Sequence, residues 1–291
     1  MSARPSARQL LPLAILIPGA LIMLFPFVWM VLSSLKTVQE TTQLPQPFFP
    51  GSPEFGNYVE AWLKPAGTFG HYYLNSVLLA VGGTAVRVAL SILAAYAFAM
   101  MRFPGKRILF ALFLLTAMVP GEVTLIPNFI TIRHLPLLGG NDLWGTGGHG
   151  LYNSFAGMIL PTAVDAFSVF LLRQAFLAIP GDYWEAASLD GCSRWGFLTR
   201  IALPMISPAV GVVAVLSAFE YWNSLLWPLV VTDSDAIRPV QVGILALQGE
   251  FDQNPNLVMA AAALSVLPVI ALYLIVQRQF RESVTFSGLR G

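Results

Sequence analysis

Six long stretches of this chain carry too few charged side chains to form the surface of a protein folded in water. An α-helix needs about 20 apolar residues to cross the roughly 30 Å hydrocarbon core of a bilayer. Charged residues make up 11% of the 291 residues, whereas soluble domains contain about a quarter. The sequence therefore predicts an all-α integral membrane protein, a single domain over residues 1–291 with six transmembrane helices. The predicted spans cover approximately residues 10–35, 74–101, 108–132, 151–178, 201–231 and 258–276.

The basic residues predict the orientation of these spans. Eleven Lys and Arg residues lie in the N-terminus, the second and fourth loops and the tail, whereas four lie in the other loops and Arg87 lies within a span. Because cytoplasmic loops carry the excess of Lys and Arg, we expect both termini and the fourth loop to be cytoplasmic. The first apolar run is longer than the core of a signal peptide, so we expect it to be a retained helix.

Two loops on the opposite side have unusual compositions. The segment 37–73 contains five prolines, which lack the amide donor of a helix, so an extended chain is expected. The segment 139–150 is dense in glycine and carries one aromatic side chain, Trp144, which predicts a flexible turn region.

The fourth loop has a helical pattern of its own. Asp182 is a candidate N-cap, with Glu185 three residues later as in a capping box. Gly191 follows Asp190 where a helix would stop, and glycine tolerates the left-handed conformation required there. Pro204 suits the first turn of a new helix. The expected order is a short helix, a turn, a second short helix and a kink into the membrane. By physics alone, this hairpin either docks on another protein or simply connects two spans.

The same residues resemble a known motif. Glu185-Ala186-Ala187, Gly191 four residues later, and Ile201-Ala202-Leu203-Pro204 after a gap of nine match the EAA loop of ABC importer permeases. The chain is similar in particular to maltose-type carbohydrate permeases, to the subunit without a large extra outer domain. From about Asn75 onward, further segments agree with that family: Ala94–Ala97, Arg102–Gly105 and Trp222-Asn223.

The resemblance implies a permease subunit that forms half of a sugar pathway in a prokaryotic cell membrane. It implies a second homologous permease, with a heterodimer expected, two cytoplasmic ATPase subunits and an extracytoplasmic solute-binding protein. The EAA loop would be the coupling helix that inserts into a groove on the ATPase. The residues carried over to ATPase docking are Asp182, Glu185, Ala186, Ala187, Ser188, Asp190, Gly191, Ile201, Leu203 and Pro204.

The sequence contains neither a nucleotide-binding motif of the phosphate-loop kind nor a catalytic constellation. Its one Gly-Lys pair, Gly105-Lys106, has neither the preceding glycine nor the following Ser or Thr of a phosphate-binding loop. We therefore expect no cofactor on this chain and expect ATP and Mg to bind the partner ATPase. The sequence offers no catalytic or metal-binding constellation, and a net charge of +1 gives no indication of nucleic-acid binding.

Four ionisable residues fall within the predicted spans, namely Arg87, Glu122, Asp165 and Glu220. Each costs about 3 kcal/mol in lipid, so such residues usually face a cavity or a partner. Asp165 is predicted to pair with Arg87. Glu122 lies between two prolines, and it either lines the pathway or sits near an interface between two separate segments.

The sequence Glu220-Tyr221-Trp222-Asn223 combines a carboxylate, two aromatic rings and an amide in one helical turn. Such groups bind sugars, but aromatic residues also fill contacts between helices, so packing against the partner permease is the competing interpretation. The substrate-pathway candidates are these four residues and Glu122.

An ion-driven secondary transporter is the alternative function. That class often shows inverted repeats with paired broken helices. No second copy of the Pro120–Pro127 pattern occurs in the chain.

Overall fold

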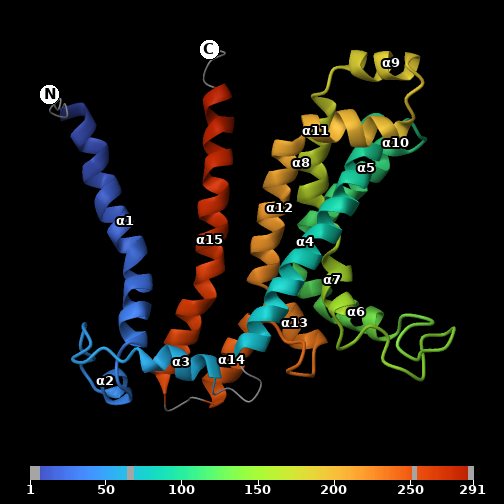
Figure 1. Cartoon of the computed structure of the whole chain (residues 1–291). Coiled ribbons are helices and arrows are strands. Elements are labelled where there is room, and N and C mark those ends of the chain that lie inside the picture. Colours follow the sequence, from blue (N-terminus) through green and yellow to red (C-terminus); the bar gives the residue numbers. More distant parts are fainter. Residues whose placement is uncertain (1–6, 64–68, 251–253, 288–291) are drawn as a thin grey trace. The chain divides into compact units, whose positions relative to one another are not determined.

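The computed structural model describes residues 7–63, 69–250 and 254–287, and every regular element among them is a helix (Figure 1). The chain divides into two compact units. Unit 1 contains residues 1–70 and 244–268, and unit 2 contains residues 71–243 and 269–291. The chain ends used in the charge count, residues 1–6 and 288–291, lie outside the described residues.

In the described part of the chain, three helices are long and apolar enough to cross a bilayer on their own. They are α1 (Ala7–Ser34), α4 (Phe69–Met100) and α15 (Pro255–Ser287), and their apolar parts are Ala14–Ser34, Phe69–Met100 and Pro255–Ile275. These helices agree with the first, second and sixth predicted spans. Helix α15 extends to Ser287, beyond both its apolar part and the predicted end at residue 276.

The other three predicted spans are wrong as single helices, because each contains a sharp bend between two helices. The predicted bounds of the fifth span, 201–231, are also wrong, because its bent pair covers residues 194–222. The angles are 106°, 56° and 80°, and the described part of the chain has six spans only if each pair counts as one. Prolines lie close to the breaks at Pro120, Pro161 and Pro208, where a missing N–H interrupts the helical hydrogen bonds. In the third span, α5 (Lys106–Leu115) and η1 (Thr116–Met118) are followed by α6 (Gly121–Arg133). In the fourth, α7 (Phe155–Ile159) and η2 (Leu160–Thr162) are followed by α8 (Ala166–Leu177). In the fifth, α10 (Arg194–Phe197), the π-helical η3 (Leu198–Ala202) and α11 (Leu203–Met205) are followed by α12 (Ser207–Trp222).

Shorter helices lie between these elements: α2 (Val38–Thr42), α3 (Gly56–Leu63), α9 (Gly181–Leu189), α13 (Leu226–Val231) and α14 (Val240–Glu250). The expectation that segment 37–73 is extended throughout is wrong. Its described prolines all lie between residues 45 and 53, which leaves room for α2 before them and α3 after them. A capping box of Thr37 and Glu40 starts α2. Helix α14 was not predicted.

Unit 1 is held together by hydrogen bonds between α1 and α3. The Asn57 amide donates to the carbonyls of Ser34 and Lys36 at 2.8 and 2.9 Å. The Tyr58 and Ser34 hydroxyls lie 2.7 Å apart. Asn57 is buried, and its bonds to carbonyls at and just beyond the end of α1 fix the turn that leads from α1 toward α3.

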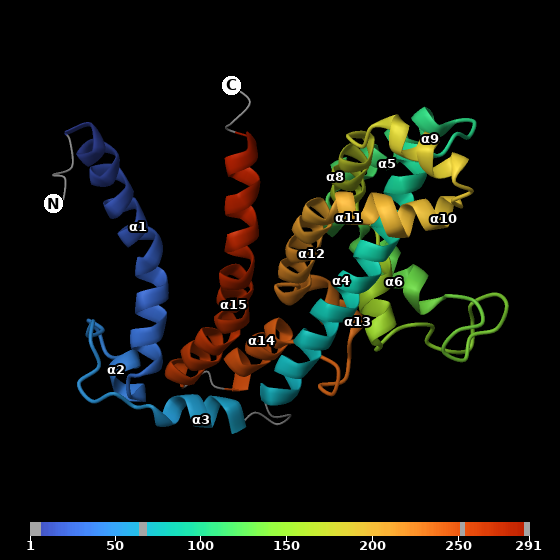
Figure 2. The same ribbon diagram turned by 45° about the horizontal axis from the view of Figure 1, so that its top comes forward.

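The core of unit 2 joins the fourth loop to the membrane helices. Tyr96 of α4 and Phe176 of α8 stack edge to face with ring centroids 5.5 Å apart. Buried residues of α9, α10, η3 and α12 complete the same cluster, among them Ala187, Phe197 and Ala202. Figure 2 shows α9, α10 and α11 at one end of the helices of unit 2. Helix α9 is therefore joined to α4 and α8 by a shared packed cluster.

Candidate functional site: a surface helix and a polar pocket

Helix α9 begins at Gly181, two residues earlier than an Asp182 cap requires. Pro180 occupies the N-cap position and makes no side-chain cap bond, while Asp182 lies in the first turn. The predicted capping box of Asp182 and Glu185 is therefore wrong. Proline suits this position because the first backbone amides of a helix have no internal partner. Asp182 instead places a negative charge near the positive end of the helix dipole.

The end of α9 follows the prediction for Gly191. Asp190 is the C-cap and Gly191 has a φ of +74°. The Gly191 amide donates to the Ser188 carbonyl at 3.2 Å, and the Cys192 amide donates to the Ala187 carbonyl at 2.9 Å. These two bonds form a Schellman motif, which requires a left-handed residue at the position of Gly191.

The chain then turns into the membrane segment as predicted. Ser193 caps α10 by accepting a hydrogen bond from the Gly196 amide at 3.1 Å. The π-helical η3 follows, and Pro204 lies in the first turn of α11. The segment Arg194–Met205 then meets α12 at 80°. The predicted order of helix, turn, second helix and kink is confirmed.

The predicted docking residues divide into two groups by exposure. Asp182, Glu185, Ala186, Ser188, Asp190, Gly191 and Pro204 are exposed, whereas Ala187 is buried and Ile201 and Leu203 are half-buried against the same core. Ala187, Ile201 and Leu203 therefore anchor the loop instead of presenting a surface.

Three large exposed apolar side chains of the loop were not predicted. Leu189, Trp195 and Tyr183 are 87%, 64% and 49% exposed. Leu189 follows Asp182 by seven residues and Glu185 by four, so the three share one face of α9. The helical spacing in the sequence contained this signal. The face therefore combines two exposed carboxylates with one exposed apolar side chain.

A second group of residues surrounds Arg87, which is 2% exposed. Its guanidinium donates through both terminal nitrogens to the Glu220 carboxylate, one bond measuring 3.2 Å, and through Nε to the Thr162 carbonyl at 2.9 Å. Asp165 Oδ2 lies 3.7 Å from Nε. The predicted Asp165–Arg87 pair is thus the looser of two contacts, and the closer partner Glu220 was missed.

Asp165 has another role that explains this loose contact. It is the N-cap of α8, and its Oδ1 accepts a hydrogen bond from the Ser168 amide at 2.8 Å. The ring of Tyr221 covers the Arg87 guanidinium at 4.6 Å, and its hydroxyl donates to the Thr162 carbonyl at 3.2 Å. Arg87 therefore links α4 to the break in the fourth span and to the C-terminal end of α12.

The pathway candidates divide into residues that line a pocket and residues that do not. Glu122, Glu220 and Asn223 line one pocket of about 520 Å³ between α6, η2, α12 and α13. Asn128 and Trp227 also line it. Tyr221 and Trp222 are buried and do not line it. Glu122 lies in the first turn of α6, after the break in the third span, so it belongs both to a separate segment and to the pocket.

Comparison with known proteins identifies the family. Residues 87–285 match the family described as "Binding-protein-dependent transport system inner membrane component". The chain belongs to this family. It is 31% identical over 275 residues to the arabinooligosaccharides transport system permease protein of Bacillus subtilis, covering 94% of this chain and 92% of the relative. It is 34% identical over 272 residues to the sn-glycerol-3-phosphate transport system permease protein of Pectobacterium atrosepticum, covering 91% and 92%.

The fold agrees with that membership. A bacterial ABC transporter involved in the import of the acidic polysaccharide alginate has a similar chain, with a TM-score of 0.78 and 24% identity. The match covers 95% of this chain and 99% of that one. The predicted family, an ABC importer permease, is confirmed, and the comparisons contain nothing that favours an ion-driven transporter.

Proposed function

We propose that this chain forms one half of the membrane pathway of a sugar importer, as a single domain over residues 1–291 with six spans. Each bent pair counts as one span in this proposal, and the loop from α9 to α11 lies in the cytoplasm together with both termini. The distribution of Lys and Arg supports this orientation. The membrane is the cell membrane of a prokaryote.

The observation that carries the proposal is the construction of the fourth loop. Its exposed face offers Glu185 and Leu189 to a partner, while Ala187 and Phe197 fasten it to α4 and α8 through the core. We propose that a cytoplasmic ATPase subunit binds this face. Two such subunits bind ATP and Mg, and their closure moves α9 and with it the membrane helices. A second homologous permease, in a heterodimer, and an extracytoplasmic binding protein complete the importer.

The test is the ATPase activity of the complex purified through this chain. Glu185→Ala removes a carboxylate from the exposed face of α9. Asp233→Ala is the matched control, because Asp233 is an exposed carboxylate in the loop that follows α13. We expect the control to keep the stimulation by the binding protein and Glu185→Ala to reduce it about tenfold, the effect of roughly 1.4 kcal/mol of lost contact.

Two results would contradict this proposal. The first is that no ATPase accompanies the wild-type chain. The second is that Glu185→Ala and Asp233→Ala behave alike, which would make α9 an ordinary connection between spans.

The pocket suggests a neutral sugar as the solute. Arg87 carries one positive charge against the two carboxylates of Asp165 and Glu220, and Glu122 adds a further negative charge to the wall. An anionic solute would be repelled by this excess, whereas amide, carboxylate and indole groups suit sugar hydroxyls and ring faces. In reconstituted vesicles we expect uptake of a neutral arabinooligosaccharide, and uptake of glycerol 3-phosphate alone would contradict the assignment.

A further inference from the structure

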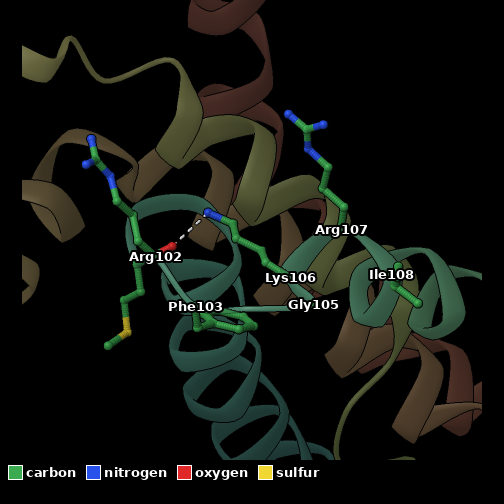
Figure 3. A pocket seen from close by; sticks show the side chains of 7 residues that line it. Arg102, Phe103, Gly105, Lys106, Arg107 and Ile108 are labelled. Carbon is green, nitrogen blue, oxygen red and sulfur yellow. Dashed lines mark hydrogen bonds between the residues drawn. The ribbon is translucent and has the colours of Figure 1, made fainter.

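The turn between α4 and α5 contains a second pocket, remote in sequence from the fourth loop. It has a volume of about 500 Å³ and is lined by seven consecutive or near-consecutive residues: Met101, Arg102, Phe103, Gly105, Lys106, Arg107 and Ile108. Figure 3 shows the Lys106 amine between the side chains of Arg102 and Arg107, all three extending toward the same side. The pocket therefore presents three positive charges within one turn of chain.

Lys106 is held in place by the end of α4. Its amine donates to the Ala99 carbonyl at 3.0 Å and to the Met101 carbonyl at 2.9 Å. An ammonium group has three donors, so one remains for a ligand. In the described part of the chain, none of Arg102, Lys106 and Arg107 forms an ion pair with a carboxylate. Like charges gathered without a counterion favour an anionic ligand.

The surface next to this pocket is apolar. Ile108, Leu112 and Leu115 of α5 are 68%, 55% and 53% exposed. Their spacing of four and three residues places them on one face of the helix. A charged group bound at the turn would thus have an uncovered apolar stripe beside it. A ligand with a negative head and a hydrocarbon tail matches both parts, whereas a free anion matches only the first.

We propose that the turn between α4 and α5 binds an anionic phospholipid. Its phosphate lies against Arg102, Lys106 and Arg107, and an acyl chain runs along the stripe of Ile108, Leu112 and Leu115. Basic pockets at the cytoplasmic ends of membrane helices suit such headgroups. The side of the membrane rests on the orientation proposed above, but the headgroup contacts do not depend on coupling to an ATPase.

The test places a fluorescent label beside the stripe. Cys192 is the single cysteine, so Cys192→Ser with Leu112→Cys gives one labelling site. The complex purified through this chain is reconstituted in phosphatidylcholine that contains a minor fraction of phosphatidylglycerol. Quenching by brominated phosphatidylglycerol, compared with brominated phosphatidylcholine, measures the preference of the site for the anionic lipid.

We expect the labelled protein to prefer phosphatidylglycerol, and Arg102→Gln and Arg107→Gln each to reduce the preference about fivefold, since a basic residue near the membrane contributes about 1 kcal/mol. Arg133→Gln is the control, because Arg133 is an exposed cation at the far end of α6. It removes one charge outside the pocket and should leave the preference unchanged.

Three outcomes would overturn the proposal. Absence of quenching by either lipid would mean that a partner protein covers α5. Equal quenching by both lipids would mean that the headgroup is not selected. Loss of the preference in inorganic phosphate, but not in sodium chloride of the same ionic strength, would assign the pocket to soluble phosphate. The readout is independent of ATP hydrolysis, so a failure of the proposed import function leaves it interpretable.

Discussion

The left-handed glycine at the end of α9 allows the stability of the candidate docking helix to be changed at one position. In Gly191→Ala, the added Cβ would meet no atom within 4 Å, but the φ of +74° would be unfavourable for alanine. The left-handed conformation costs a residue with a Cβ about 1–2 kcal/mol. The whole effect therefore falls on the backbone, where the Cys192 amide bonds to the Ala187 carbonyl.

Hydrogen exchange measures this effect directly, because local opening exposes the amides of the Schellman motif. A loss of about 1–2 kcal/mol raises the exchange rate of the Cys192 amide by about 5- to 30-fold. Gly181→Ala is the matched control: it lies at the first residue of α9, its Cβ also meets nothing within 4 Å, and its φ is not left-handed. Alanine is favoured over glycine in a helix, so the control should exchange no faster than wild type. Equal exchange in Gly191→Ala and wild type would refute the argument that this turn depends on glycine.

Three further perturbations follow from the structure. A Cβ on Gly83 would lie 2.6 Å from the Tyr221 ring, whereas one on its neighbour Gly82 would meet its nearest atom at 3.7 Å. Gly83→Ala should therefore lower the free energy of unfolding by about 1–3 kcal/mol through overpacking. It should also lower the melting temperature in detergent, and Gly82→Ala should not. Arg87→Gln should lower the free energy of unfolding by about 3 kcal/mol, the low end for breaking a buried ion pair, because the partner side chain of Glu220 is 63% exposed. A melting temperature like that of wild type would contradict this. Asp142→Asn should make the segment 139–150 more sensitive to proteolysis at neutral pH. Hydrogen bonds from the backbone amide and hydroxyl of Thr146 and from the Trp144 amide lower the pKa of the Asp142 carboxyl below its usual value. The carboxylate therefore stabilises the segment above about pH 3.9, and this stability is lost as pH falls through the lowered pKa. Equal cleavage of variant and wild type at pH 7 would exclude the role.

The apolar stretches predict three of the membrane helices well and three poorly. The first, second and sixth stretches each contain one long helix, and α15 extends beyond its predicted end. The third, fourth and fifth stretches are also apolar but bend by 56° to 106°. Hydropathy measures transfer into lipid and contains no term for backbone hydrogen bonds. The prolines near the breaks do contain that information, but Pro268 inside α15 shows that a proline alone does not decide whether a helix bends.

The turn after α9 and the kink into the membrane segment were predictable because their signals are local. Gly191 and Pro204 act on hydrogen bonds within a few residues, so their positions in the sequence are sufficient. The burial of Ala187 was not predictable in the same way, because it depends on contacts with Phe197 and with helices distant in the sequence. A motif identifies which residues belong together, but the core decides which of them face a partner.

The partner of Arg87 shows why the pocket was only partly predicted. Hydropathy identifies a costly cation in α4 and offers two carboxylates, Asp165 and Glu220, without a means of choosing between them. The choice follows from the break before α8. Asp165 occupies the N-cap there, and its bond to the Ser168 amide engages one carboxylate oxygen, which leaves only the other to approach Arg87 at 3.7 Å. Glu220 has no competing role within its helix and can offer both oxygens. An aspartate directly before an apolar run and shortly after Pro161 is a recognisable N-cap pattern, so predicting the helix break first would have favoured Glu220 as the main counterion.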